Sequence, residues 1–328
     1  MDRRTFIVST GAVLSAVPIR TSAQTDRKLR KIGFLGVSRL ADSSLGTTKA
    51  FIDALKDLGW TEGQNVAFES RWSEQRNDRL PELAAELIRS NVDVIVVTSG
   101  ATGTKAAKDA SNRVPIVMAV AADPVKFGLI TSFAQPGGNV TGLAQPLIDW
   151  GKWLELAREA VRGATHIGVI ANSTNMVYAD YVAQNDEAAR RLGLQLQMLP
   201  VTRPEDFTDA FAALDRNGAN ALVVGPDPLF TSNMQTIIDL AMAHRIPVIA
   251  ATRRFAEVGA MVSFGINFNY VFGRTAVYVD KILRGTKPAD LPVEQPERFE
   301  LVVNRKTAER LGLTIPQSLL LRANHIIE

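Results

Sequence analysis

Short apolar runs alternate with longer amphipathic stretches along most of this chain, and the alternation occurs twice. Strands that alternate with helices form a parallel sheet with helices on both faces. One run, residues 92–97, is rich in β-branched residues, which is typical of a strand covered on both sides. The sequence therefore predicts an α/β fold with two doubly wound parallel-sheet lobes. The expected strands are 32–37, 66–71, 92–97, 115–120, 166–171, 194–200, 221–224 and 247–250, and the expected helices are 47–58, 80–88, 102–110, 150–161, 178–192, 207–215, 231–244 and 270–283.

Three extended segments stand at the junctions of these blocks, at residues 140–142, 261–266 and 299–303. We interpret them as crossings between the lobes, which gives a three-segment hinge. A chain of 328 residues is long enough for two domains. We expect lobe one to contain residues 29–141 and 266–291, and lobe two to contain residues 142–265 and 292–328.

The first 24 residues have the three parts of an export signal. Arg3 and Arg4 precede an apolar run over residues 6–17, and small residues at 21–23 end the segment. The run is shorter than the roughly 20 apolar residues that a membrane-spanning helix needs. An arginine pair followed by phenylalanine is typical of a twin-arginine signal. We therefore expect residues 1–24 to direct export to the periplasm, the alternative being a disordered start on a cytosolic enzyme.

Composition excludes several classes of function. The formal net charge of +3 and the lack of any lysine- or arginine-rich block argue against nucleic-acid binding. The chain contains no cysteine, which excludes disulfides, thiolate metal sites, a cysteine nucleophile and a lipid-modified cysteine. Its three histidines are scattered and none has a partner at metal-ligand spacing, so we expect no metal and no other cofactor. No Gly-x-Ser-x-Gly or Gly-x-Gly-x-x-Gly pattern points to a hydrolase or a dinucleotide enzyme.

The loop at residues 98–104 is a candidate anion site. In open parallel sheets, ligands bind beyond the carboxyl ends of the strands, and this loop follows the strand at 92–97. Its small residues would let a ligand approach the free backbone N–H groups of a helix start. The same composition is also typical of an ordinary helix start, so both interpretations remain open. The candidate residues here are Ser99, Gly100, Ala101 and Thr102.

Two Asp-Pro pairs follow expected strands. Asp123 precedes Pro124, and Asp227 precedes Pro228. Aspartate followed by proline is a standard helix opening, in which the carboxylate caps the first turn. A carboxylate has several acceptor positions, so the same group could also receive a ligand ammonium. Capping alone and capping combined with ligand binding are both consistent with the sequence.

Four further candidates lie in loops after strands. Asn172 could contact a polar ligand group or shape a turn. Phe230 could form a ligand wall or belong to the core. Ser38 follows the first expected strand and Thr252 follows the strand at 247–250, which places both at the expected ligand edge.

Several longer motifs, taken together, resemble the substrate-binding protein family of ABC transporters. The resembling group has the type I periplasmic binding-protein fold and includes tryptophan- and tyrosine-type binding components. The resemblance covers nearly the whole chain after residue 28. Its motifs are LGWTEGQN at 58–65, RLPELAAEL at 79–87, DPV at 123–125, QPGGNVTGL at 135–143, PDPLF at 226–230, KILRG at 281–285, KPADLPVEQP at 287–296 and IPQSLLLRA at 315–323.

The resemblance implies a receptor without catalytic activity. Such a protein captures a small solute between its lobes, here an amino acid or related carboxylate, aromatic ones included, and delivers it to a permease in the inner membrane. Many members carry a lipid-anchoring cysteine, which this chain lacks, so we expect a freely diffusing periplasmic monomer. The alternatives are an exported enzyme on a similar two-lobed scaffold and a sensory module that presents its ligand to a receptor.

The resemblance also implies roles for the candidate residues. The family's cleft loops match the loops that carry Ser38 and Asn172. Ser99 and the amides of residues 100–102 would hold a carboxylate, and either Asp227 or Asp123 would receive an ammonium. Apolar and aromatic residues such as Phe230 would cover the ligand's side chain.

Overall fold

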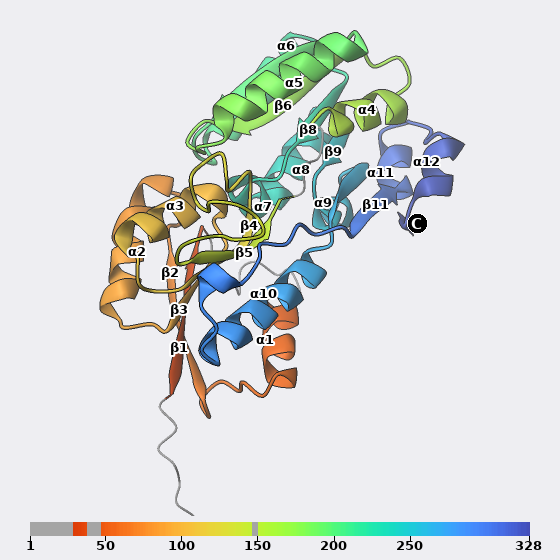
Figure 1. Cartoon of the computed structure of the whole chain (residues 1–328). Helices are drawn as coiled ribbons and strands as arrows, with labels where there is room; N and C mark the ends of the chain where they lie inside the picture. Colours follow the sequence, from red (N-terminus) through yellow and green to blue (C-terminus); the bar gives the residue numbers. More distant parts are fainter. Residues whose placement is uncertain (1–28, 38–46, 146–149) are drawn as a thin grey trace, which may run out of the picture.

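Two α/β lobes lie next to each other in the computed structural model, which describes residues 29–37, 47–145 and 150–328 (Figure 1). Each lobe is built on one sheet with helices on both faces, as the alternation of strands and helices predicts. The expected export signal at residues 1–24 and the candidate Ser38 lie outside the described residues. Within the described ranges, no helix combines the length and the apolar character needed to cross a membrane.

The first lobe contains a five-stranded parallel sheet in the order β2-β1-β3-β4-β5. Side chains of β3 alternate between two cores: Val94 and Val96 pack toward α1 and α10, while Ile95 and Val97 pack toward α2 and α3. This double burial confirms the expectation drawn from the β-branched run. The elements are β1 (Arg30–Gly36), α1 (Thr47–Asp57), β2 (Val66–Trp72), η1 (Asn77–Arg79), α2 (Leu80–Arg89), β3 (Val94–Val97), α3 (Gly100–Ala110), β4 (Ile116–Ala121), β5 (Val140–Ala144), α10 (Phe268–Leu283) and η2 (Pro288–Asp290).

The second lobe contains a seven-stranded sheet in the order β12-β11-β10-β9-β8-β6-β7. Helices α4, α5, α11 and α12 cover one face, and helices α6 to α9 cover the other. All neighbouring strands are parallel except β10 and β11. The elements are α4 (Gly151–Ala160), β6 (His166–Asn172), α5 (Tyr178–Leu192), β7 (Gln195–Val201), α6 (Asp206–Arg216), β8 (Ala221–Val224), α7 (Pro228–Ser232), α8 (Met234–Ala243), β9 (Val248–Ala250), α9 (Arg253–Val258), β10 (Val262–Ile266), β11 (Phe299–Asn304), α11 (Arg305–Arg310), α12 (Gln317–Arg322) and β12 (His325–Ile327).

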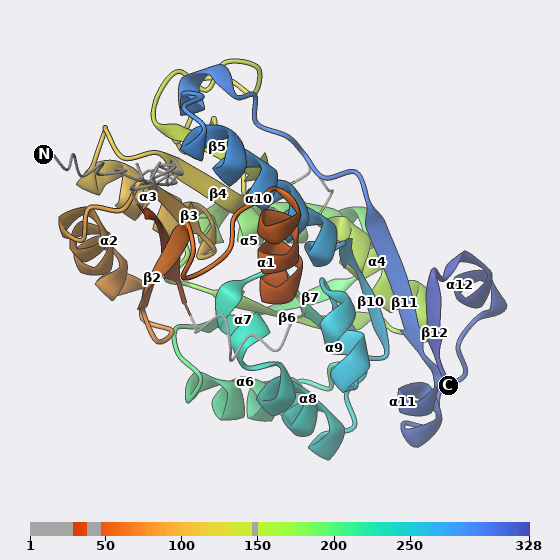
Figure 2. The ribbon, with the colours of Figure 1, turned by 90° about the horizontal axis from the view of Figure 1, so that it is seen from below.

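The three extended segments interpreted as crossings are strands of the two sheets. β5 pairs with β4 in the first lobe, whereas β10 and β11 pair with each other in the second, side by side in Figure 2. The chain changes lobe next to these strands: after β5, between β10 and α10, and between η2 and β11. β5 continues to Ala144, so three residues beyond the expected boundary at 141 still belong to the first sheet. The other lobe boundaries stay a prediction.

The helix expected over residues 231–244 is divided in the structure into α7 and α8. Asn233 stands at the break with φ −120° and ψ 24°, outside the helical region. Its Nδ2 donates to the carbonyl oxygen of Leu229 at 2.7 Å and to Oε1 of Gln75 at 2.8 Å. A side chain that bonds to nearby backbone competes with the helix, which explains the interruption.

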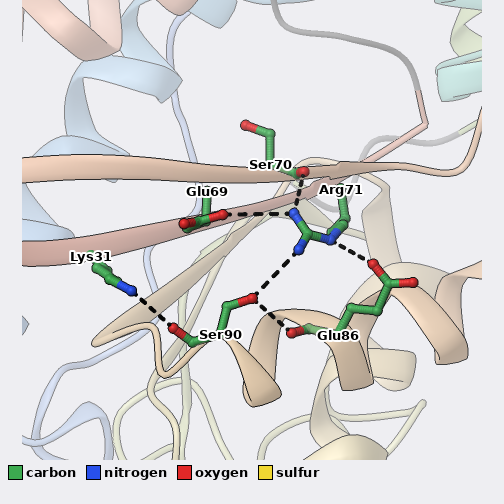
Figure 3. Close-up of polar contacts among 6 residues, drawn as sticks. All are labelled: Lys31, Glu69, Ser70, Arg71, Glu86 and Ser90. Carbon is green, nitrogen blue, oxygen red and sulfur yellow. Dashed lines mark hydrogen bonds and ion pairs between the residues drawn. The ribbon is translucent and has the colours of Figure 1, made fainter.

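A polar cluster ties α2 to β2, the edge strand of the first sheet (Figure 3). Nε of Arg71 donates to Oε2 of Glu86 at 2.6 Å, and its Nη1 lies 3.8 Å from Oε2 of Glu69. Ser90 accepts from Nη2 of Arg71 at 3.4 Å and donates to the carbonyl oxygen of Glu86 at 3.0 Å. Charged side chains along an edge strand also disfavour pairing with another chain.

Candidate functional site

A cavity of about 670 Å³ lies between the lobes, where the carboxyl ends of both sheets meet. This volume is within the range of roughly 300–1,000 Å³ that is common for small-molecule sites. Both lobes and the crossing segments contribute walls. The first lobe contributes Val37, Gln75, Thr98, Gly100, Ala101, Val120, Ala122, Phe268, Asn269 and Phe272; the second contributes Asn175, Val177, Pro226, Asp227, Pro228, Thr231, Ser232, Met234, Thr252, Arg253, Arg254, Glu257 and Glu300; and Gln145, Trp150, Ile266 and Asn267 lie at or beside the crossings.

Asp227 is the charged group buried most deeply in this cavity wall, with 7% of the residue exposed. It caps α7, and its Oδ1 accepts from the backbone N–H of Leu229 at 2.8 Å and from Nδ2 of Asn172 at 3.0 Å. Its Oδ2 accepts from Nδ2 of Asn175 at 2.8 Å. Among the described residues, no basic side chain pairs with it, and burial raises the pKa of Asp227. A buried carboxylate supported by neutral donors alone is a suitable receptor for a cationic ligand group.

Thr252 lies one strand away from Asp227 on the same edge of the sheet. Asp227 follows β8 and Thr252 follows β9, and these two strands are neighbours in the sheet. Thr252 is 5% exposed, lines the cavity, and its hydroxyl has no hydrogen-bond partner among the described residues. Thr252 therefore adds a buried hydroxyl, unpartnered within the described part of the chain, to the same cavity wall.

The N-terminus of α3 forms part of the opposite wall. Gly100 and Ala101 line the cavity, and their helix begins with free backbone N–H groups. Ser99 lies beneath the helix, where its hydroxyl donates to the carbonyl oxygen of Leu35 at 3.3 Å. Thr102 donates to Oδ1 of Asn175 at 3.3 Å, so its hydroxyl contacts the other lobe. The structure thus brings two of these four candidates, Gly100 and Ala101, to the cavity wall.

The two Asp-Pro pairs differ in their surroundings. Asp123 has a left-handed backbone, with φ 31°, and its Oδ1 accepts from the backbone N–H of Lys126 at 3.1 Å. Asp123 does not line the cavity, although its neighbour Ala122 does. We therefore favour Asp227 over Asp123 as the ammonium receptor.

Two other candidates, Asn172 and Phe230, do not line this cavity. Asn172 is held by Asp227 and by Thr174, whose hydroxyl donates to its Oδ1 at 2.7 Å, so its role is to orient the carboxylate. Phe230 is 1% exposed and packs against Phe207 with ring centroids 6.3 Å apart. It faces the core and a side chamber of about 20 Å³ behind Asp227.

Several cavity residues were not singled out from the sequence. Trp150 precedes α4, and Asn267 and Glu300 lie beside the crossings of β10 and β11. Arg253, at the start of α9, also lines the cavity. The sequence does offer one signal for these residues. Polar residues next to a predicted crossing are candidates for the cavity wall, because the crossing segments lie beside the gap between the lobes. No group of acidic, histidine or cysteine side chains in the described part of the chain could hold a metal ion.

Polar contacts join the lobes across the gap. Asn77 Nδ2 donates to Oγ1 of Thr174 at 2.9 Å, and Asn233 reaches Gln75 as described above. Lys126 of the first lobe forms an ion pair with Asp180 of α5. These contacts bridge the two lobes across the gap.

We expect Lys126→Met to weaken ligand binding about two-fold, because a partly exposed ion pair contributes roughly 0.5 kcal/mol to the closed state. The loss should be larger at low salt, where screening is weaker. Titration calorimetry at two salt concentrations measures it. Lys105→Met is the matched control, since Lys105 pairs with Asp109 within α3. Equal effects of the two substitutions would contradict a role for the interlobe pair.

Comparison with known proteins agrees with this architecture. The family model described as ABC transporter substrate binding protein matches residues 38–327. The chain belongs to this family. Solved members of the type I binding-protein class share its two-lobed α/β fold.

This substrate-binding protein is 27% identical over 293 residues to the tyrosine-binding protein of Clostridioides difficile strain R20291, covering 88% of this chain and 83% of the relative. It matches a Streptococcus pneumonia ABC domain in complex with L-Trp with a TM-score of 0.82 and 24% identity, over 91% of this chain and 100% of the other. It matches the ligand-free, open structure of a substrate binding protein from Clostridium difficile with a TM-score of 0.63 and 25% identity, over 92% and 99%.

Proposed function

We propose that this protein is an extracytoplasmic receptor that captures an amino acid or a related carboxylate between its lobes and delivers it to an ABC permease. The observation that carries this proposal is the buried carboxylate of Asp227, which lacks a cationic partner among the described residues and faces a cavity. The N-terminus of α3 on the opposite wall favours an anion through its free N–H groups and the helix dipole. A cation receptor and an anion receptor in one cavity suit a zwitterion.

The relatives support the same class of ligand. One is a tyrosine-binding protein and another was solved with L-Trp. Apolar side chains in the same lining, among them Val120, Met234 and Phe272, can cover an apolar or aromatic side chain. The remaining lining consists of amides, hydroxyls and ion pairs, which is the usual composition of a binding pocket.

The proposal includes release into the periplasm by the export signal at residues 1–24 and function as a soluble monomer without a cofactor. Transport rather than sensing is favoured because the family model is that of transporter components. An exported enzyme would instead need a reactive side chain in the cavity that the ligand contacts.

Thermal unfolding with a panel of amino acids and aromatic carboxylates tests the function. A ligand present at about 100 times its Kd should stabilise the protein by roughly 2.7 kcal/mol. That corresponds to an increase in Tm of about 4 °C for a chain of 328 residues, since the entropy of unfolding is roughly 2.1 cal/mol/K per residue. Native mass spectrometry of the protein purified from the periplasm should show the retained ligand. No shift with any compound, together with turnover of one of them, would overturn the proposal in favour of the enzyme.

A further inference from the structure

Thr102 of the first lobe makes two hydrogen bonds to the second lobe. Both reach the loop between β6 and α5, residues 173–177. The Thr102 hydroxyl donates to Oδ1 of Asn175 at 3.3 Å and accepts from the backbone N–H of Met176 at 3.2 Å. Nδ2 of the same Asn175 side chain donates to Oδ2 of Asp227 at 2.8 Å. Because the two branches of an amide carry different atoms, a donor that holds Oδ1 keeps Nδ2 turned toward the carboxylate.

A second chain of hydrogen bonds starts from Asn77, which lies in η1 of the first lobe. Nδ2 of Asn77 donates to Oγ1 of Thr174, in the same β6–α5 loop, at 2.9 Å. The Thr174 hydroxyl has one proton, and it donates that proton to Oδ1 of Asn172 at 2.7 Å. Nδ2 of Asn172 donates to Oδ1 of Asp227 at 3.0 Å. The first lobe is thus linked to both carboxylate oxygens of Asp227, to each through one asparagine amide.

Each asparagine also accepts from a backbone N–H of its own lobe. Oδ1 of Asn175 accepts from the N–H of Val177 at 3.2 Å. Oδ1 of Asn172 accepts from the N–H of Thr174 at 3.0 Å. Separation of the lobes leaves these local bonds in place and removes the bonds from the first lobe. The amides are therefore held more firmly when the lobes are in contact.

The carboxylate of Asp227 depends on these amides for its support. Its other donor among the described residues is the backbone N–H of Leu229, and burial raises the pKa of Asp227. Hydrogen bonds to the ionised form of a carboxyl group favour that form. A looser hold on the two asparagines therefore favours the protonated form.

Other ionisable groups near Asp227 belong to α5, α9 and β11. Tyr178 and Tyr181 of α5 line the small chamber behind Asp227. Burial and the charge of Asp227 raise the pKa of Tyr181, so this phenol stays neutral while the carboxyl titrates. The remaining groups line the same cavity and form ion pairs with one another: Arg253, Arg254, Glu257 and Glu300.

We propose that the β6–α5 loop couples contact between the lobes to the hydrogen-bond support of the Asp227 carboxylate, with Asn77 and Thr102 as positioning residues. Contact stabilises the ionised carboxylate, and by reciprocity the ionised carboxylate stabilises contact. The consequence for transport rests on the proposed function: opening of the lobes weakens the ammonium receptor and thereby favours release.

The test requires lobes that are held in contact without a ligand. Lys126 and Asp180 form an ion pair between the lobes. In the double variant Lys126→Cys/Asp180→Cys, a short bis-maleimide can join the two thiols. The chain has no cysteine of its own, so only these two positions react. This locked protein is the parent of every variant in the titration.

Carbon-13 NMR of the aspartate carboxyl groups follows the titration of Asp227, whose signal is identified by its loss in Asp227→Asn. In Thr102→Val and in Asn77→Ala, we expect Asp227 to titrate at higher pH than in the locked parent. Each substitution removes an interlobe hydrogen bond that holds one of the two amides. Thr102→Ser keeps the hydroxyl and should restore the titration of the parent.

Thr275→Val is the matched control. The Thr275 hydroxyl donates to the carbonyl oxygen of Val271 within α10 at 3.0 Å, and Thr275 does not line the cavity. It should leave the titration of Asp227 unchanged. The inference is overturned if Thr102→Val and Asn77→Ala titrate as the parent does, because the donors of the second lobe then suffice. It is also overturned if Thr102→Ser shifts as far as Thr102→Val. The titration uses no ligand, so its failure leaves the proposed function standing, and failure of the thermal panel leaves the titration result standing.

Discussion

Asp227→Asn is expected to reduce ligand affinity by roughly 100-fold or more. Asparagine keeps the shape of the side chain and can still cap α7 through the N–H of Leu229, but it carries no charge for a ligand ammonium. Removing one member of a buried, hydrogen-bonded charge pair costs about 3 kcal/mol of binding free energy, and often more. Titration calorimetry with the ligand found in the thermal panel measures the loss.

The folded state of the same variant should be unharmed. Burial raises the pKa of Asp227 above its ordinary value. In the absence of ligand, the stability of the folded state therefore falls as the pH rises from the ordinary pKa to the raised pKa and the buried carboxyl ionises. The neutral asparagine avoids this cost, but its Nδ2 would face the Nδ2 donor of Asn175. Because these two effects oppose each other, we expect a Tm at neutral pH close to that of the unmodified protein. Loss of binding with an unchanged Tm separates a ligand contact from a structural defect.

Asp123→Asn is the matched control, since it alters the other Asp-Pro pair and does not touch the cavity wall. It should leave affinity within about two-fold. A similar loss in both variants, or no loss in Asp227→Asn, would contradict the assignment of Asp227. Acidification gives an independent check. Affinity of the unmodified protein should fall as the pH drops through the raised pKa of Asp227, because only the ionised carboxylate attracts an ammonium.

The strands and most helices could be predicted because their signal is local. A run such as β3, buried on both faces, is apolar at every position regardless of its partners. The sheet membership of β10 and β11 could not be predicted in this way. Their antiparallel pairing joins residues that are 33 to 41 positions apart, from Ile266 with Phe299 to Val262 with Val303, and no local pattern encodes that choice.

The candidate site was predictable in its position but not in its side-chain directions. The rule that ligands bind beyond strand ends pointed to Gly100, Ala101, Asp227 and Thr252, and these four residues line the cavity. It could not distinguish Asp227 from Asp123, because the two carboxylates differ in the hydrogen-bond donors that residues distant in the sequence provide. Asn172 and Asn175 lie 55 and 52 positions from Asp227 and make it a buried, supported carboxylate.

Ser99 shows a second reason why the sequence does not determine the direction of a side chain. A Cβ added at Gly103 would lie 1.8 Å from Oγ of Ser99, so the helix leaves room for this hydroxyl underneath itself. The hydroxyl then satisfies the carbonyl of Leu35 on a neighbouring strand. A serine at a helix start could equally face a ligand. Whether Ser99 faces a ligand or lies beneath the helix depends on Gly103, one turn later.

Gly265→Ala is expected to destabilise the protein by about 3 kcal/mol and to lower Tm by roughly 4–5 °C. A Cβ at this position would lie 1.8 Å from the carbonyl oxygen of Ala251. This oxygen belongs to the backbone of the loop after β9, so it cannot rotate away as a flexible side chain could. Ala251 is also held through its N–H, which donates to the carbonyl oxygen of Val224 at 3.0 Å.

The damage should extend from stability to binding. Ala251 immediately precedes Thr252, and Gly265 lies opposite Glu300. Both Thr252 and Glu300 line the cavity, so a shift that relieves the clash also moves the cavity wall. Gly273→Ala in α10 is the matched control, because a Cβ there meets nothing within 4 Å. Alanine at a helix position should stabilise the fold by up to about 1 kcal/mol. Differential scanning calorimetry of both variants decides the matter: if Gly265→Ala unfolds at the same temperature as Gly273→Ala, the close approach of β10 to the loop after β9 does not constrain this site.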